Sequence, residues 1–209
     1  KIAIVLPGHS WPETNFYLVL APDKTGVLLP SAFQTGCMNL QEIQQFLFAS
    51  QGILRDHVKQ LLSTLQPTGD VIDLSVTFNQ FPIDLAHISF TSHFSELGFL
   101  AWHHMPRMKH LTGTIQWDEN HGKLQLMQHR ALFSDPDVFD QPIAFDELSG
   151  NVYWRVGSDG VRIVDLDSIV AKNQDLALYT QGTLILSPKH SPVADLHAIF
   201  TLAEANQVA

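Results

Sequence analysis

Histidine and cysteine are the side chains in this sequence best suited to metal binding and nucleophilic chemistry. The chain has 11 His and a single Cys, and two of the histidines, His103 and His104, are adjacent. Adjacent residues on a strand point to opposite faces. No His-Glu-x-x-His motif, second cysteine, calcium-loop spacing or Gly-x-Ser-x-Gly motif occurs. Cys37 has no basic residue close in sequence that would activate it. We therefore predict no metal site, no cofactor and no nucleophilic catalysis.

Carboxylates, the residue type that acid–base catalysis needs, gather in one stretch of the sequence. They are Asp135, Asp137, Asp140, Asp146 and Glu147. The stretch contains prolines and reads as extended, and carboxylates in such a segment more often solvate a loop or protect a sheet edge than form an acid–base pair. The sequence therefore predicts that the protein is not an enzyme. A hydrolase is kept only as a further alternative.

Charge and hydropathy exclude several other classes of protein. The 209 residues include 21 Asp+Glu against 12 Lys+Arg, a net charge of −9. Nucleic acids and anionic lipid head groups attract clustered basic residues, so this balance argues against both as partners. No run approaches the ~18 apolar residues of a membrane-spanning helix. Because the chain starts with Lys, we expect residues 1–209 to be a single fragment of a longer protein, whose membrane anchor lies outside it.

Most of the sequence has the pattern of β-strands. Short runs rich in Val, Ile, Leu, Phe and Tyr are bounded by Gly, Pro, Asn and Asp. These runs are residues 2–6, 16–21, 71–78, 85–94, 111–117, 123–129, 148–156, 161–170, 176–186 and 195–202. Gly-containing turns at 118–122 and 157–160 join consecutive runs, as in hairpins. The sequence therefore predicts a mainly β protein with an antiparallel meander rather than parallel βαβ units.

Residues 39–66 are the exception, because their apolar residues recur every three or four positions, as on a helix. These residues are Leu40, Ile43, Leu47, Leu54, Val58, Leu61, Leu62 and Leu65. Asn39 and Glu42 have the spacing of a capping pair, Gly52 separates two helices and Pro67 ends the second. We predict a helical hairpin that packs its apolar stripe on a face of the sheet.

A repeat with a period of 37 residues links two of the predicted strands. LTGTIQW at 111–117 recurs as LSGNVYW at 148–154, and a Gly-containing turn and a return strand follow each copy. Because side chains alternate along a strand, both tryptophans fall on the apolar side. We predict that the apolar residues of these strands and of their return strands line one face of the sheet: Leu111, Ile115, Trp117, Leu124, Leu126, Leu148, Val152, Trp154, Val161 and Ile163.

Residues 94–202 resemble the repeated region of the YhdP/AsmA-like family of Gram-negative envelope proteins. The resemblance rests on elements that occur in order: FSEL at 94–97, Trp102, Pro106, LTG at 111–113, a return strand to Leu126, FSDPDVF at 133–139, PIAFDELSG at 142–150, Trp154, and a strand from Asp195 to Phe200. Residues 1–93 match only loosely, and the helical hairpin departs from the family pattern.

The resemblance implies a large protein that an N-terminal helix anchors in the inner membrane, with a long periplasmic body and neither catalysis nor a metal. The family is similar to the repeating-β-groove bridge proteins, whose curved sheets carry phospholipid acyl chains between membranes along an apolar inner face. This implies a curved, twisted antiparallel sheet with two tandem β-repeat units in residues 94–202. The expected partners are phospholipid acyl chains and the adjacent repeats of the full-length protein, and the ten apolar residues above become candidates for the lining of the groove.

Two functions fit the residues themselves. An acyl chain needs continuous apolar surface, because each CH₂ kept from water contributes about 0.8 kcal/mol. A structural or scaffolding module, in which the helices seal the sheet and its edges join neighbouring repeats or a partner, gives the same pattern. The resemblance favours lipid transport over this alternative.

Overall fold

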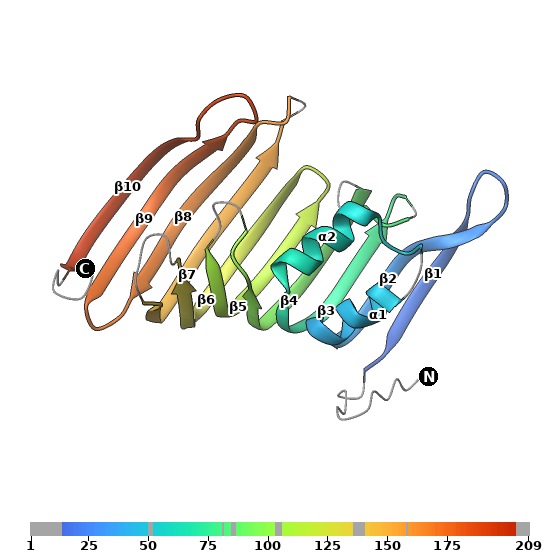
Figure 1. Cartoon of the computed structure of the whole chain (residues 1–209), viewed down its shortest axis with the longest axis horizontal. Helices are drawn as coiled ribbons and strands as arrows, with labels where there is room; N and C mark the ends of the chain where they lie inside the picture. The colour runs from blue at the N-terminus through green and yellow to red at the C-terminus, as the bar shows by residue number, and fades with distance from the viewer. Residues whose placement is uncertain are drawn as a thin grey trace.

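The computed structural model describes residues 14–49, 52–80, 82–84, 87–102, 106–135, 141–157 and 159–203. Across these residues, ten strands form one antiparallel sheet in chain order, so each strand pairs with its neighbours in sequence. Figure 1 shows the strands side by side in a single layer. The predicted mainly β meander is therefore confirmed. The strands are β1 Phe16–Pro22, β2 Leu28–Asn39, β3 Thr68–Phe78, β4 Ile88–Phe99, β5 Arg107–Asp118, β6 His121–Ser134, β7 Ile143–Val156, β8 Arg162–Lys172, β9 Leu176–Leu186 and β10 Val193–Ala203.

One strand of the sheet, β2, was missed by the sequence prediction, whereas the other nine overlap predicted runs. Its segment contains Pro30 and Gly36, residue types that weaken a strand pattern. Pro30 pairs with Leu20 at a register shift between β1 and β2, a place where a strand tolerates the missing N–H. The predicted run at 2–6 lies outside the described residues.

Both predicted hairpin turns are confirmed. Two residues, Glu119 and Asn120, join β5 to β6. Between β7 and β8, the N–H of Gly157 donates to the carbonyl of Val161 over 2.8 Å. Such short connections hold consecutive strands antiparallel.

Bulges interrupt the ladders at four residues with positive φ: Asp73, Glu96, His110 and Ser168. Each coincides with a register shift against a neighbouring strand. Bulges bend a strand and increase its twist. Glu96 and His110 lie on neighbouring strands, and Nδ1 of His110 and Oε2 of Glu96 form a hydrogen bond. These four positions therefore give the sheet local bends that a regular ladder lacks.

Two helices separate β2 from β3, which confirms the predicted helical hairpin. They are α1, Leu40–Ala49, and α2, Asp56–Leu65. The Oδ1 atom of Asn39 accepts hydrogen bonds from the backbone N–H groups of Gln41 (3.2 Å) and Glu42 (3.4 Å), so Asn39 caps α1. Gly52 lies between the helices with a φ of 77°.

The helices lie over β2, β3 and β4 on one face of the sheet (Figure 1). The burial pattern of β4 identifies that face. Ile88, Ser92 and Phe94 point to one side of β4 and are buried, whereas Thr91 and His93 point to the other and are exposed. The helices therefore cover the face that carries Phe94.

A cluster of buried side chains runs across this face, from β4, which the helices overlie, to β8. It consists of Phe94, Leu111, Ala131, Leu148 and Ala171, which come one each from β4, β5, β6, β7 and β8. The core of this segment thus runs across the strands, as expected for a sheet of which one face is apolar.

Candidate functional site

One row of directly paired residues crosses all ten strands on the apolar face. We call it the apolar row: Leu18, Phe33, Val76, Phe90, Trp117, Gly122, Trp154, Val164, Leu184 and Ala194. Every member is hydrophobic or glycine. With about 4.8 Å between neighbouring strands, the nine gaps give the row a length of roughly 43 Å. The row is the longest continuous feature of this face.

A second row lies on the same face, two residues away from the apolar row along each strand, and it is also apolar in the middle of the sheet. Ile115 pairs with Leu124, Leu124 pairs with Val152, and Val152 pairs with Leu166. The 37-residue repeat therefore places equivalent residues of β5 and β7 on either side of β6. The register confirms that Ile115, Trp117, Leu124, Val152 and Trp154 share one face, as predicted. Their contact with a lipid stays a prediction.

Three further predicted residues lie on this face but belong to its packed core. Leu111 and Leu148 are 5% and 8% exposed. Leu126 is half-buried and packs against them. Leu111 and Leu148 therefore hold the strands together in this structure, and surface for a ligand comes from the half-buried residues beside them.

The prediction was wrong for Val161 and Ile163. Ile163 pairs with Arg155 on the opposite face, and Val161 lies in the turn before β8. Trp154 instead pairs with Val164, and Leu166 follows it on the same face. The turn uses one residue more than the sequence pattern implied, and a shift of one residue moves every side chain of a strand to the other face.

Aromatic rings line part of the apolar row. Phe90 stacks on Trp117 with ring centroids 6.2 Å apart and an interplanar angle of 8°. Trp117 and Trp154 are 5.5 Å apart and tilted by 48°. Rings this close attract one another beyond their simple burial. All three are half-buried, so they present apolar surface at the end of the strands near the β5–β6 turn.

On the opposite face, the residues next to the apolar row in sequence form a row of directly paired polar residues. This row is Tyr17, Gln34, Ser75, Thr91, Gln116, Lys123, Tyr153, Asp165, Thr183 and Asp195. A shallow hollow of about 590 Å³ lies over its middle, and Ser75, Gln116, Lys123 and Tyr153 are among the lining residues. The sheet is therefore amphipathic along its whole length.

In the described part of the chain, no three His, Cys, Asp or Glu residues lie close enough together to hold a metal ion. His103, His104, Asp137 and Asp140 lie outside that part. Among the described helices, none is long and apolar enough to cross a membrane.

The surroundings of Glu147 and Cys37 do not favour catalysis. Glu147 forms an ion pair with Lys172, with 3.1 Å between Oε2 and Nζ. Burial, and then the charges of Asp70 and Asp73, raise the pKa of the Cys37 thiol. A raised pKa leaves less of the nucleophilic thiolate at neutral pH. Cys37 is therefore a poor nucleophile.

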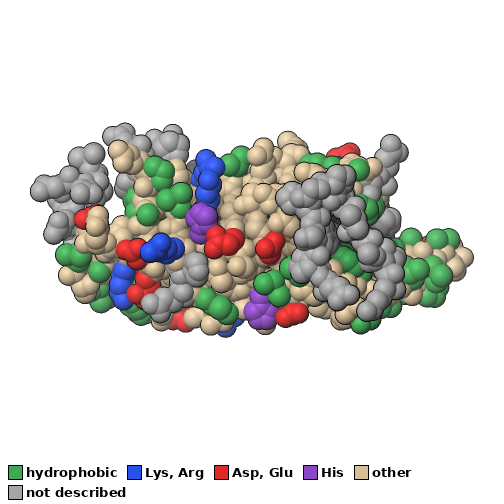
Figure 2. All heavy atoms as spheres, turned by 90° about the horizontal axis from the view of Figure 1, so that it is seen from below, with side chains coloured by type: hydrophobic (Ala, Val, Ile, Leu, Met, Phe, Trp, Pro, Cys, Tyr) green, Lys and Arg blue, Asp and Glu red, His purple; other side chains and the backbone are tan. Residues whose placement is uncertain are grey.

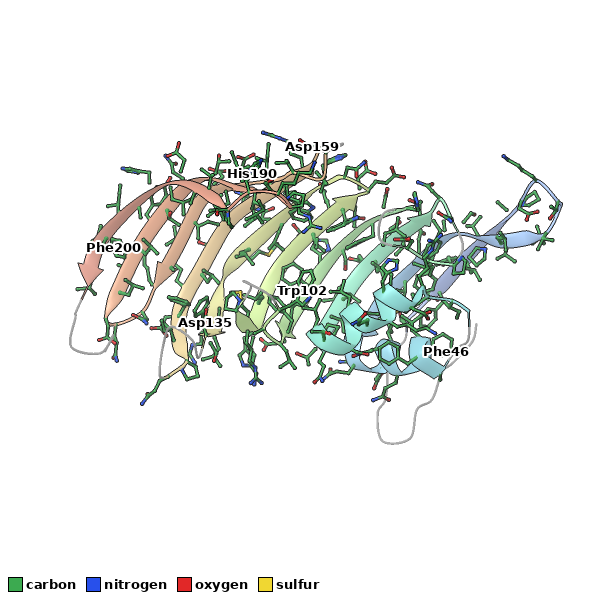
Figure 3. All side chains as sticks on the ribbon, turned by 45° about the horizontal axis from the view of Figure 1, so that its top comes forward. Phe46, Trp102, Asp135, Asp159, His190 and Phe200 are labelled. Atoms are coloured by element: carbon green, nitrogen blue, oxygen red, sulfur yellow. The ribbon has the colours of Figure 1, made fainter. Side chains whose placement is uncertain are left out.

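Hydrophobic side chains are exposed at both edges of the sheet. On the hairpin of β1 and β2, which projects at the right of Figure 2, Leu20, Val27 and Leu28 are exposed. At the other end of the sheet, Phe200 of β10 is exposed (Figure 3). Elsewhere in Figure 2, acidic and basic side chains alternate with uncharged ones.

Sequence reasoning missed the part of the apolar face outside the repeat. Phe33, Val76 and Phe90 continue the apolar row toward β1, and Val164 and Leu184 continue it toward β10. Phe33 lies in the missed strand β2 and the other four lie in predicted apolar runs, but only the pairing of strands shows that these residues line up with the two tryptophans.

Comparison with protein families gives a match over the whole chain. The family of the YhdP protein matches residues 1–209, so the match extends beyond the segment 94–202 whose motifs carried the resemblance. No curated protein and no solved structure gives a significant match. Because this match covers the whole chain, the chain belongs to the YhdP family.

Proposed function

We propose that this chain is a periplasmic segment of an envelope lipid-transport protein, and that its apolar face shields phospholipid acyl chains between the inner and outer membranes. The apolar row carries the proposal, because all ten of its members are apolar while the row beside it on the other face is polar throughout. A single-layer sheet with such a face must either cover it or use it.

The dimensions of the face suit acyl chains. A bilayer about 30 Å thick in its hydrocarbon region holds two layers of acyl chains, so a row of roughly 43 Å exceeds the length of one chain. Each CH₂ transferred from water to the row contributes about 0.8 kcal/mol. Recognition by apolar area alone needs no fixed polar group, which suits cargo that has to move.

The half-buried residues Ile115, Trp117, Leu124, Val152 and Trp154 form the proposed contact surface. Val164 and Leu166 replace Val161 and Ile163 as its continuation on β8. The outer strands of the described sheet are proposed to pair with adjacent repeats of the full-length protein, because β1 and β10 expose hydrophobic side chains and each pairs with only one strand among the described residues.

A sealed structural module is the second candidate, and one observation favours it. Leu111, Leu148 and Phe94 are already buried without any ligand. In such a module the helices and the packed core hold the sheet rigid, and the apolar face carries no cargo.

Native mass spectrometry of the freshly purified chain, with solvent extraction of bound lipid, distinguishes these functions. We expect co-purified phospholipid at a reproducible stoichiometry. Ile115→Asp places a charge on the proposed surface and should abolish the bound lipid. Thr114→Asp, the neighbouring residue on the polar face, is the matched control and should leave it unchanged. Lipid-free protein, or equal lipid in both folded variants, would exclude the conduit and leave the sealed module.

A further inference from the structure

We propose that α2 is a hinged lid over the apolar row, latched at its N-terminal end by the carboxylate of Asp84. In Figure 1 α2 lies over β3 and β4, and the lid is proposed to cover Val76 of the row. Release of the latch would uncover that part without unfolding the sheet. The existence of the lid stands on the contacts of α2 alone, whereas its role in lipid access rests on the function proposed above.

The underside of α2 is apolar, and its outer side is polar. Val58 is buried, and Leu61, Leu62 and Leu65 are half-buried, at the spacing of one helical face. His57, Gln60 and Ser63 on the other side are exposed. Phe33, Val76 and Phe90, on the strands that the helices overlie in Figure 1, continue the same row that carries the tryptophans further along. The lid thus shields apolar surface equivalent to that proposed to hold acyl chains.

The N-terminal end of α2 is fastened by contacts with residues 83 and 84. Leu54 and Ile83 form an isolated parallel bridge, in which the N–H of Ile83 donates to the carbonyl of Ile53 over 2.8 Å. Asp84 Oδ2 lies 3.3 Å from Nε of Arg55, and its Oδ1 lies 3.3 Å from Nε2 of His57. One carboxylate with 14% of its side chain exposed therefore holds two residues at the start of the helix.

The C-terminal end of α2 is held by the chain itself. Leu65 is followed by Gln66, whose φ is 44°, and by Pro67, which leads directly into β3. The carbonyl of Leu65 also accepts a hydrogen bond of 2.7 Å from the N–H of Leu100, beyond β4. This end cannot leave the sheet far. Opening would begin at Asp84 and pivot about Gln66.

The preceding helix adds little resistance to such a movement. None of the side chains of α1 is buried. The Nε2 group of Gln44 donates to the carbonyl of Leu62 over 3.0 Å. Gly52, with its positive φ, lies in the connection between the helices. Among the side-chain contacts at this end of α2, the latch at Asp84 is therefore the one whose loss should most affect the lid.

Hydrogen exchange measured by mass spectrometry on the whole chain tests the latch. Asp84→Asn keeps the size of the side chain and removes its charge. We expect amides of α2 to exchange at least tenfold faster in this variant, with exchange in β6–β9 unchanged. Glu147→Gln removes a comparable ion pair with Lys172 far from the helices and should leave α2 unchanged. Equal exchange of α2 in Asp84→Asn and in the parent would overturn the lid, as would faster exchange of β2–β4 together with α2 before the rest of the sheet.

A disulfide provides the opposite perturbation and does not depend on how Asp84→Asn folds. Leu54→Cys with Ile83→Cys, in a Cys37→Ser background, joins bridged positions, whose strand-like spacing of about 4.8 Å lies within the range for a disulfide. Oxidation should slow the exchange of α2, and reduction should restore it. No difference between the oxidised and reduced forms would overturn the lid.

A diazirine derivative of palmitate then tests the role of the lid. Crosslinks should fall on β5–β9 in every folded variant, and on residues 71–78 only when the latch is removed. Crosslinks confined to β5–β9 after the lid has opened by hydrogen exchange would overturn its role in access. Crosslinks nowhere on the apolar face would instead overturn the proposed function, while hydrogen exchange would still decide whether the lid exists.

Discussion

Trp117 on β5 and Trp154 on β7 meet over Gly122 of β6, with ring centroids 5.5 Å apart. The two rings belong to equivalent positions of a 37-residue repeat. They can meet across the intervening strand because Gly122 has no side chain. A Cβ atom there would clash with Cζ2 of Trp154. The glycine thus sets the aromatic part of the apolar row.

Gly122→Ala should therefore destabilise the chain, because Trp154 has to shift to make room for the methyl group. We expect the free energy of unfolding in urea to fall by about 1–3 kcal/mol. Gln125→Ala, at an exposed position on the same strand, is the control and should change it by less than about 0.5 kcal/mol. Adding Trp154→Leu should absorb part of the cost of Gly122→Ala, because the added Cβ would also lie 2.7 Å from the carbonyl oxygen of Gln116. Equal effects of the alanine substitution with and without the tryptophan would show that the ring is not the obstacle.

Phe94 should be the most sensitive of the core positions, because it is 2% exposed and packs in the core cluster with Leu111. Phe94→Ala should lower the free energy of unfolding by about 3–5 kcal/mol through lost burial and the cavity left behind. His93→Ala, on the exposed side of β4, should have little effect. Comparable urea midpoints for the two variants would contradict the assignment of faces on β4.

The corrected register of β8 makes neighbouring residues behave differently. Val164→Asp places a carboxylate between Trp154 and Leu184 and should cost about 2 kcal/mol or more. Ile163→Asp places one opposite Arg155, where an opposite charge offsets much of the lost apolar contact, so it should cost less than about 1 kcal/mol. Thermal and urea unfolding of both variants would check this order, and the reverse order would restore the register expected from sequence.

The thiol of Cys37 should react slowly at neutral pH, because burial raises its pKa. A raised pKa means that the thiolate, and with it the rate of modification by a disulfide reagent, rises only at higher pH than for a free thiol. Asp73→Asn removes one of the two charges that raise the pKa of Cys37 and should move the midpoint of the pH–rate profile downward. Asparagine tolerates the positive φ at this position. A midpoint equal to that of a free thiol in the parent protein would contradict the burial of Cys37.

The sequence predicted most of the strands and the faces of their side chains correctly, and the errors have physical causes. Alternation along β5 and β7 identified the apolar side of the repeat because the period of a strand is two residues. The sequence prediction missed β2 because Pro30 and Gly36 weaken its strand pattern. Pairing with β1 and β3 on both sides, rather than the propensity of its own residues, stabilises this strand. Ile163 was misplaced because the exact length of a turn decides the face of the following strand, and composition does not fix that length.

The amino-acid sequence by itself determined the amphipathic meander, the helical hairpin, the absence of any recognised catalytic motif and the resemblance to a family that matches the entire chain. These depend on local periodicity and on short-range turns, which each segment carries within itself. Tertiary structure decided the rest. Only the pairing of strands aligns Leu18 at one edge with Ala194 at the other in one apolar row. Only packing buries Leu111 and Leu148 while leaving the tryptophans half-exposed, and only the docking of α2 joins Arg55 to Asp84. Such contacts link residues far apart in sequence, and no local pattern specifies them.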